Sequence, residues 1–123
     1  MTKTFVDAGV LIAAVRGNEA QIRTAVAVLR DPTRTFVASA FLRLELLPKP
    51  LFFRNQIEAR FYEDFFAQVS FWSTENDQII EVAERVAAQH GLNALDALHV
   101  AAAFVLGADE MVTTEGVNKS LRQ

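Results

Sequence analysis

The chain has 123 residues, a length that predicts one domain over residues 1–123. Apolar residues make up 51% of the sequence and charged residues 22%, with three prolines and five glycines, which excludes a disordered or low-complexity chain. Cysteine is absent, so disulfides, thiolate metal sites and cysteine nucleophiles are excluded, and we expect a reducing, cytoplasmic location.

The net charge of −3 is unevenly distributed. Residues 1–60 contain nine Lys/Arg and five Asp/Glu, whereas residues 61–123 contain three and ten. An arginine-rich first half suits a face that binds phosphates. Ordinary solvated charges on helices explain the same pattern, so charge alone leaves both interpretations open.

Hydrophobic periodicity and capping residues predict alternating strands and helices along the chain. In chain order these are a strand at 4–6, helices at 8–15 and 18–31, a strand at 35–38, helices at 39–48 and 55–69, a strand at 69–73, helices at 74–90 and 93–107, and a strand at 110–113. Asn18 and Ser39 are expected to cap two of the helices, and Asn93 to open another. Pro48 and Pro50 are expected to mark a break, and the residues after Thr113 to form one short turn or helix.

Strands separated by helices require crossover connections, which favour parallel pairing. The pattern therefore predicts an α/β protein, a three-layer α/β/α domain with a central parallel sheet of four or five strands. Ligands of such domains collect at the carboxyl ends of the strands. No apolar stretch approaches the roughly 18 to 20 residues that cross a bilayer, and Asp7 interrupts the apolar start, so we expect no membrane segment and no signal peptide.

Four acidic residues lie close to the expected strand ends or helix starts: Asp7, Glu45, Asp96 and Glu115. Each also has a purely structural interpretation. Asp7 suits a turn or cap, Glu45 a solvated helix face, and Glu115 an exposed loop, whereas Asp96 stands three residues after Asn93 as in a capping box.

Together the acids favour a metal site. Asp7 and Asp96 lie among apolar residues, where an unpaired charge is costly. Two carboxylates about 5 Å apart repel by roughly 3 kcal/mol at an effective dielectric near 20, so a cluster needs protonation or a bound cation. Without cysteine and with two histidines, oxygen ligands select Mg²⁺ or Mn²⁺. Metal-dependent phosphodiester hydrolysis is the leading chemistry.

The two histidines and a search for nucleotide-binding motifs say less about function than the acids do. His99 lies one helical turn after Asp96 and is expected to be a packed, hydrogen-bonded core residue, with contact to the acids as the alternative; His90 is expected at a helix end. No nucleophile elbow, P-loop or dinucleotide fingerprint is present, which argues against those classes of enzyme.

Eight of the twelve aromatic residues fall within residues 51–72. Phe61, Phe65 and Phe71 are expected in the core. The others exceed what one helix face buries, so they either pack in the core or form an exposed apolar surface for a homodimer or a partner. The residues expected at that surface are Phe52, Phe53, Tyr62 and Phe66.

The segments around the four acids resemble the motifs of PIN-domain ribonucleases, a family that includes the VapC-type toxins of bacterial toxin–antitoxin pairs. They are residues 5–12 (FVDAGVLI), 44–48 (LELLP), 95–103 (LDALHVAAA) and 111–115 (MVTTE). The resemblance implies endonucleolytic cleavage of RNA, a Mg²⁺ or Mn²⁺ site, a homodimer and an antitoxin as a candidate partner. It maps Asp7, Glu45 and Asp96 onto metal-binding acids, and Glu115 onto a position where the family usually has aspartate.

Two features depart from the family pattern, and they keep a second function open. Gly9 stands where many members have a polar residue, and Glu115 is one methylene longer than aspartate. A PIN fold that has lost catalysis and serves as an RNA- or protein-binding scaffold is the alternative to the nuclease. A phosphatase with Asp7 as nucleophile is disfavoured because Gly9 replaces the second aspartate of an Asp-x-Asp start. Arg16 and Arg43 are candidates for guiding phosphate.

Overall fold

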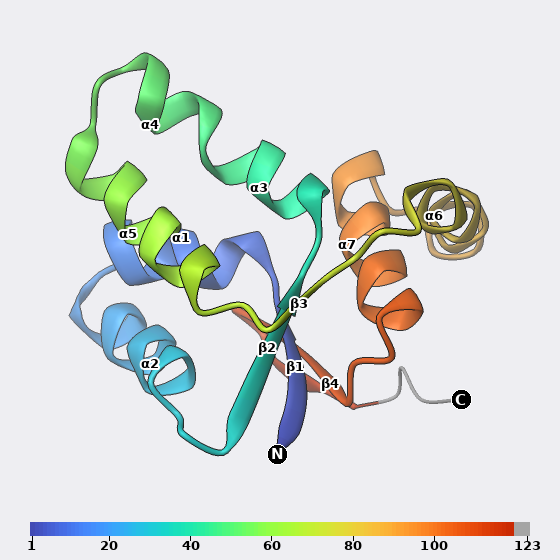
Figure 1. Cartoon of the computed structure of the whole chain (residues 1–123), viewed down its shortest axis with the longest axis horizontal. Coiled ribbons are helices and arrows are strands. Elements are labelled where there is room, and N and C mark those ends of the chain that lie inside the picture. Colours follow the sequence, from blue (N-terminus) through green and yellow to red (C-terminus); the bar gives the residue numbers. More distant parts are fainter. Residues whose placement is uncertain (120–123) are drawn as a thin grey trace.

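The structure is a computed structural model that describes residues 1–119. Its strands form one sheet in the order β3-β2-β1-β4-β5, with helices on both faces (Figure 1). The elements are β1 (Thr2–Val6), α1 (Ala8–Arg16), α2 (Glu19–Leu29), β2 (Arg34–Ala38), α3 (Ala40–Leu46), α4 (Pro48–Phe52), α5 (Gln56–Ala67), β3 (Phe71–Trp72), α6 (Asn76–His90), α7 (Ala94–Val105), β4 (Glu110–Thr113) and β5 (Gly116–Asn118). The predicted three-layer α/β/α fold is confirmed.

The central strand β1 pairs in parallel with both β2 and β4, and β3 pairs in parallel with β2. Successive side chains of a strand point to opposite faces, so the sheet contributes side chains to two hydrophobic cores, one on each face. Val6 packs with α1, α2, α3 and α5 on one face, and the adjacent Phe5 packs with α6 and α7 on the other. Figure 1 shows these two groups of helices on either side of the sheet. The parallel pairing places the carboxyl ends of β1, β2 and β4 at one edge.

Side-chain caps fix the starts of several helices, as the sequence predicted. The side chains of Asn18, Ser39 and Asn93 each accept a hydrogen bond from a backbone N–H in the first turn of α2, α3 and α7 respectively. Gly91 ends α6 with φ 66°, a left-handed conformation that glycine adopts without a steric penalty. Local signals therefore determine where these helices begin and end.

The structure corrects three local predictions. The strand expected at 69–73 is reduced to the two residues of β3, and Phe71 is exposed there, with Lys3 Nζ 5.6 Å from its ring centroid. The turn or helix expected after Thr113 is the antiparallel strand β5, which pairs with β4. Pro48 begins the short helix α4 instead of only breaking the chain, because proline is tolerated in a first turn.

The aromatic segment divides between core and surface. Tyr62 and Phe66 are 1% and 4% exposed and pack in the core with Phe65, so their expected place at an exposed surface is wrong. They lie on the face of α5 that packs against α1 and the sheet. Phe52 and Phe53 are 79% and 71% exposed. Within residues 1–119, no helix combines the length and the apolar character that crossing a membrane requires.

A buried carboxylate joins the three central strands at the end opposite the predicted site. Glu110 Oε2 accepts hydrogen bonds from Thr4 Oγ1 (2.6 Å) and Arg34 Nε (2.7 Å), and Arg34 also pairs with Asp31. Burial alone would raise the pKa of Glu110, but the Thr4 and Arg34 hydrogen bonds and the Arg34 charge bring it below the usual value. The Glu110 carboxylate therefore joins β4 to β1 through Thr4 and to β2 through Arg34.

We expect Glu110→Gln to lower the free energy of unfolding at pH 7 by about 3 kcal/mol, because it removes the buried carboxylate that pairs with the partly buried Arg34. A carboxyl with a lowered native pKa stabilises the protein above its unfolded pKa of about 4.5, and this contribution disappears as the pH falls through the native value. Urea denaturation at pH 7 and pH 4 measures the difference, with the exposed Glu115→Gln as control. Equal loss in both variants would contradict the assignment.

Candidate active site

Asp7, Glu45 and Asp96 approach one another beyond the carboxyl end of β1. Asp7 directly follows β1, and its backbone N–H donates to Val112 O on the neighbouring strand β4 (2.9 Å). Glu45 lies on α3 and Asp96 in the first turn of α7. The charges of Glu45 and Asp96 both act on the Asp7 carboxyl, so three residues from distant parts of the sequence share one electrostatic environment.

The pKa of Asp7 is raised above its usual value, chiefly because the carboxyl is partly buried. Repulsion from Asp96 and Glu45 adds to the increase, whereas the nearby His99 and a hydrogen bond from the Ala8 backbone oppose it. The Asp7 side chain makes no capping hydrogen bond, although the residue is the N-cap of α1. The capping interpretation of Asp7 therefore does not account for its position.

The other two acids have defined partners. Asp96 Oδ2 accepts a hydrogen bond from Asn93 Nδ2 (2.9 Å), and the Asp96 backbone N–H donates to Asn93 Oδ1 (2.9 Å), so Asp96 takes part in the cap of α7 while it faces solvent. Glu45 Oε1 lies 2.6 Å from Nε2 of the buried His99. The prediction of a packed, hydrogen-bonded His99 is confirmed, and its partner is one of the predicted site residues.

Glu115 lies apart from this group. It follows β4, is exposed, and lines with Thr114 a groove of about 380 Å³ against α1 and α2. The charges that shift Asp7 are those of His99, Asp96 and Glu45, and Glu115 is not among them. The structure thus brings together three of the four predicted acids.

Gly9 leaves space between Asp7 and the β4–β5 hairpin. A Cβ atom at this position would lie 3.4 Å from Thr114 Cγ2 and 3.7 Å from Asp7 Oδ2, which are ordinary van der Waals distances. A Cβ atom would therefore fit at position 9 beside the Asp7 carboxylate.

The two arginines considered as phosphate guides are already engaged. Arg16 binds Glu58 Oε1 through Nε and Nη2, both at 2.8 Å, and Arg43 pairs with Glu63 (2.9 Å) while it lies over the Phe66 ring. Sequence reasoning did not identify Glu58, which is buried on α5 and also accepts a hydrogen bond from Tyr62. Its position on the apolar face of α5, one turn before Tyr62, was the available signal.

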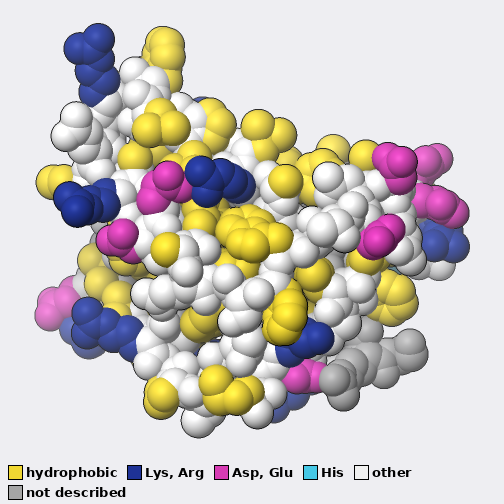
Figure 2. Space-filling model, in the orientation of Figure 1, with side chains coloured by type: hydrophobic (Ala, Val, Ile, Leu, Met, Phe, Trp, Pro, Cys, Tyr) yellow, Lys and Arg dark blue, Asp and Glu magenta, His cyan; other side chains and the backbone are white. Residues whose placement is uncertain are grey.

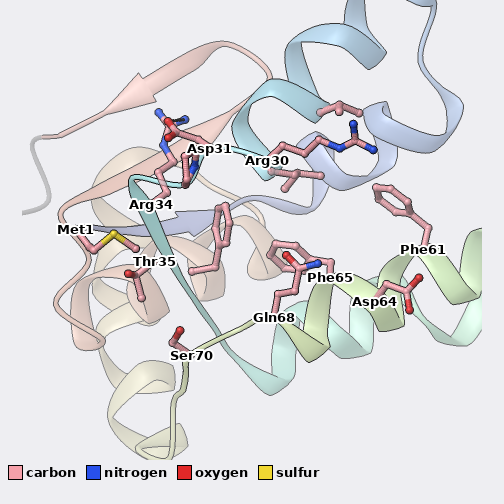
Figure 3. Close-up of a pocket in the computed structure, with 14 residues that line it drawn as sticks. Met1, Arg30, Asp31, Arg34, Thr35, Phe61, Asp64, Phe65, Gln68 and Ser70 are labelled. Carbon is pink, nitrogen blue, oxygen red and sulfur yellow. Dashed lines mark hydrogen bonds and ion pairs between the residues drawn. The ribbon is translucent and has the colours of Figure 1, made fainter.

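A pocket of about 700 Å³ lies away from the acids, between α2, β2 and α5 (Figure 3). Arg30, Asp31 and Arg34 contribute its charged rim near the amino end of β2, and none of the four predicted acids lines it. Asp31 and Arg34 pair with each other there, and Arg34 also binds Glu110. This pocket is therefore separate from the candidate site.

The chemistry of these side chains suits a divalent cation. Carboxylate oxygens are the ligands that Mg²⁺ and Mn²⁺ prefer, and Asp7 lacks a cationic arginine or lysine among the groups that shift it. Within residues 1–119, however, no three His, Asp or Glu side chains are close enough to surround one ion. Mg²⁺ is commonly held by one or two carboxylates, with water and substrate phosphate as the other ligands. The residues fit that kind of open site and not a closed protein cage.

The comparisons with known proteins agree with the fold. The family model of the PIN domain matches residues 4–116, so the chain belongs to the PIN domain family. Among solved structures, a matching chain comes from VapBC2 of Rickettsia felis bound to a DNA fragment from their promoter. It is 12% identical, covers 87% of this chain and 84% of its own, and superposes with a TM-score of 0.63. No curated protein matches the sequence.

We expect Asp7→Asn to raise the melting temperature at pH 7 in the presence of EDTA. Because the native pKa of Asp7 lies above its unfolded value of about 3.8, the native state loses stability as the pH rises through the interval between them. The uncharged amide removes that penalty, so the gain should shrink as the pH is lowered toward 4. Thermal denaturation of both proteins measures this. The exposed Asp64→Asn serves as control, and a gain independent of pH would contradict the explanation.

Proposed function

We propose that this protein is a divalent-metal-dependent endoribonuclease. The observation that carries the proposal is the partly buried Asp7 carboxyl, which lies beside two further acids at the carboxyl edge of a parallel sheet in a PIN domain. In this class of sheet the carboxyl edge is where ligands bind.

Electrostatics explains why the site would need a cation. A phosphodiester carries a negative charge, and it would be repelled by Asp7, Glu45 and Asp96 together. A bound Mg²⁺ or Mn²⁺ would offset that charge and lower the pKa of a water molecule to supply the attacking nucleophile. Asp7 and Asp96 would hold the ion, with Glu45 as the third acid. Glu115, which lies apart from these three acids in the structure, would assist from the β4–β5 hairpin.

We expect Asp7→Asn and Asp96→Asn to reduce Mn²⁺-dependent RNA cleavage by at least about 100-fold. Mutation of the groups that only orient metal ligands commonly costs 10- to 100-fold, and loss of a ligand should cost at least as much. Each amide keeps the shape of the side chain while it removes a charge that holds the ion. Single-turnover cleavage of a labelled RNA measures the loss, and circular dichroism checks the fold. Asp64→Asn, an exposed aspartate on α5, is the matched control and should cleave as the wild type does.

A scaffold that has lost catalysis is the second candidate function. The isolation of Glu115 and the absence of a three-ligand group in the described residues favour it. The two functions differ in their response to metal. A nuclease should melt at a higher temperature in Mn²⁺, and this increase should disappear in Asp7→Asn. RNA binding without cleavage in any divalent metal, with no such increase, would support the scaffold.

We further propose that the protein is the toxin of a toxin–antitoxin pair and acts in the cytoplasm. The support is the likeness of its fold to a chain of the VapBC2 complex and its PIN domain. An antitoxin would need to be produced together with the nuclease, since uncontrolled RNA cleavage harms the cell. Expression of the chain alone should arrest growth, and Asp7→Asn should not.

A homodimer is proposed on the basis of an exposed apolar surface on α4 and the start of α5. Phe52 and Phe53 lie there with their rings edge to face, 5.0 Å apart, and Leu51 and Ile57 are also exposed. Figure 2 shows hydrophobic side chains in this upper part of the molecule. Burial of two phenylalanine side chains contributes roughly 3 to 6 kcal/mol before the cost of association is subtracted.

We expect the wild type to sediment as a dimer and Phe52→Glu/Phe53→Glu to sediment as a monomer, because two carboxylates would be desolvated in the contact. Analytical ultracentrifugation measures the masses. Ile80→Glu, an exposed apolar residue on α6, is the control and should remain a dimer. A monomeric wild type, or a dimer unchanged by both glutamates, would contradict the proposed contact.

A further inference from the structure

His99 occupies an unusual place for a polar side chain. It lies on α7 one turn after Asp96 and is 1% exposed, packed between the Phe5 ring and the core on that face of the sheet. Its Nδ1 atom is buried and has no hydrogen-bond partner within the described residues. An unsatisfied buried polar atom destabilises a fold, and a leucine here would avoid that cost. The other ring nitrogen must provide a compensating interaction.

That interaction is the bond from His99 Nε2 to Glu45 Oε1, at 2.6 Å. An ionised carboxylate can only accept, so Nε2 carries the hydrogen and donates it. The distance is that of a short, charge-assisted hydrogen bond. The hydrogen bond links α7 to α3. Helix α7 therefore provides Asp96 and, through His99, also orients the Glu45 carboxylate on α3.

Glu45 needs such an anchor for a physical reason. Its side chain has several rotatable bonds and is 27% exposed, so it can turn toward solvent. Repulsion from Asp7 favours that movement in the absence of a cation. The His99 N–H opposes it from a rigid, buried position. Oε2 accepts no hydrogen bond from the described part of the chain, and it remains available to a ligand.

We propose that His99 is a positioning residue of the nuclease site, which holds the Glu45 carboxylate beside Asp7 and Asp96 through its Nε2–H. This inference rests on the proposed function, because it assigns His99 a role in that same site. His99 would not touch the RNA or the reacting atoms, and it would act through Glu45. The groups that surround a metal site and orient its ligands in this way commonly account for a 10- to 100-fold difference in metal affinity or activity.

Two amide substitutions separate this role from simple packing. Glutamine places its side-chain amide near the position of imidazole Nε2, whereas asparagine places it near Nδ1. We therefore expect His99→Asn to weaken Mn²⁺ binding and cleavage by about 10- to 100-fold, and His99→Gln to restore most of both. The loss of the electron paramagnetic resonance signal of free Mn²⁺ measures binding, and single-turnover assays at saturating RNA measure cleavage.

Asp7→Asn is included in the same series to keep the two proposals distinguishable. If Asp7→Asn cleaves and binds Mn²⁺ as the wild type does, the proposed function is wrong. If Asp7→Asn loses both while His99→Asn and His99→Gln equal the wild type, only the positioning role is overturned. Equal losses in both His99 variants, with melting temperatures that fall in parallel, would also overturn it, because packing alone would then explain the effect.

A measurement on the unmodified protein tests the proposal even if the His99 variants do not fold. Nitrogen-15 NMR of the imidazole should show the hydrogen on Nε2, and Mg²⁺ should shift that resonance in the wild type but not in Asp7→Asn. An Nε2 atom that carries no hydrogen would overturn the proposal. So would an imidazole signal that stays fixed while Mg²⁺ shifts the backbone amides of Asp7 and Asp96.

Discussion

The partly buried carboxyl of Asp7 is the constraint on which the site depends. β1 is the central strand, flanked in parallel by β2 and β4, so the residue that follows it lies in the middle of the carboxyl edge. Burial and the neighbouring Asp96 and Glu45 all raise its pKa, and the fold tolerates this cost at neutral pH. A residue kept in an electrostatically unfavourable place is a candidate for function, because a structural role would favour a neutral side chain.

The treatment of two other carboxylates makes the contrast clear. Glu58 and Glu110 are more deeply buried, yet each has an arginine and a hydroxyl as hydrogen-bond partners. Burial, together with the hydrogen bond to Glu58, raises the pKa of the Tyr62 hydroxyl. The protein thus supplies its own cations to the carboxylates that join elements. The charged groups that act on Asp7 are one histidine and two acids. Under the proposed function, an external cation would balance that group when a phosphodiester binds.

The aromatic segment illustrates how similar residues serve different ends. Phe66 lies on α5, whose apolar face packs against the sheet side of the molecule, and it is buried. Phe52 and Phe53 lie at the end of α4, where the chain turns with Arg54 in a left-handed conformation (φ 56°), and both project into solvent. Composition and spacing do not distinguish these cases, because exposure depends on which neighbouring helix covers a position. Tyr62 shows the same limit: it is buried because α5 packs it into the core, where its hydroxyl donates to Glu58.

The sequence by itself determined the alternation of strands and helices, the caps at Asn18, Ser39 and Asn93, and the placement of Asp7 at a strand end, because these depend on local periodicity and backbone hydrogen bonding. Tertiary structure decided the rest. It brought Glu45 and Asp96 near Asp7, left Glu115 apart, shortened β3 and paired β5 with β4. It also joined His99 to Glu45, 54 positions away in the chain. Contacts between distant residues depend on how helices pack across the sheet, and single-sequence patterns do not encode that geometry.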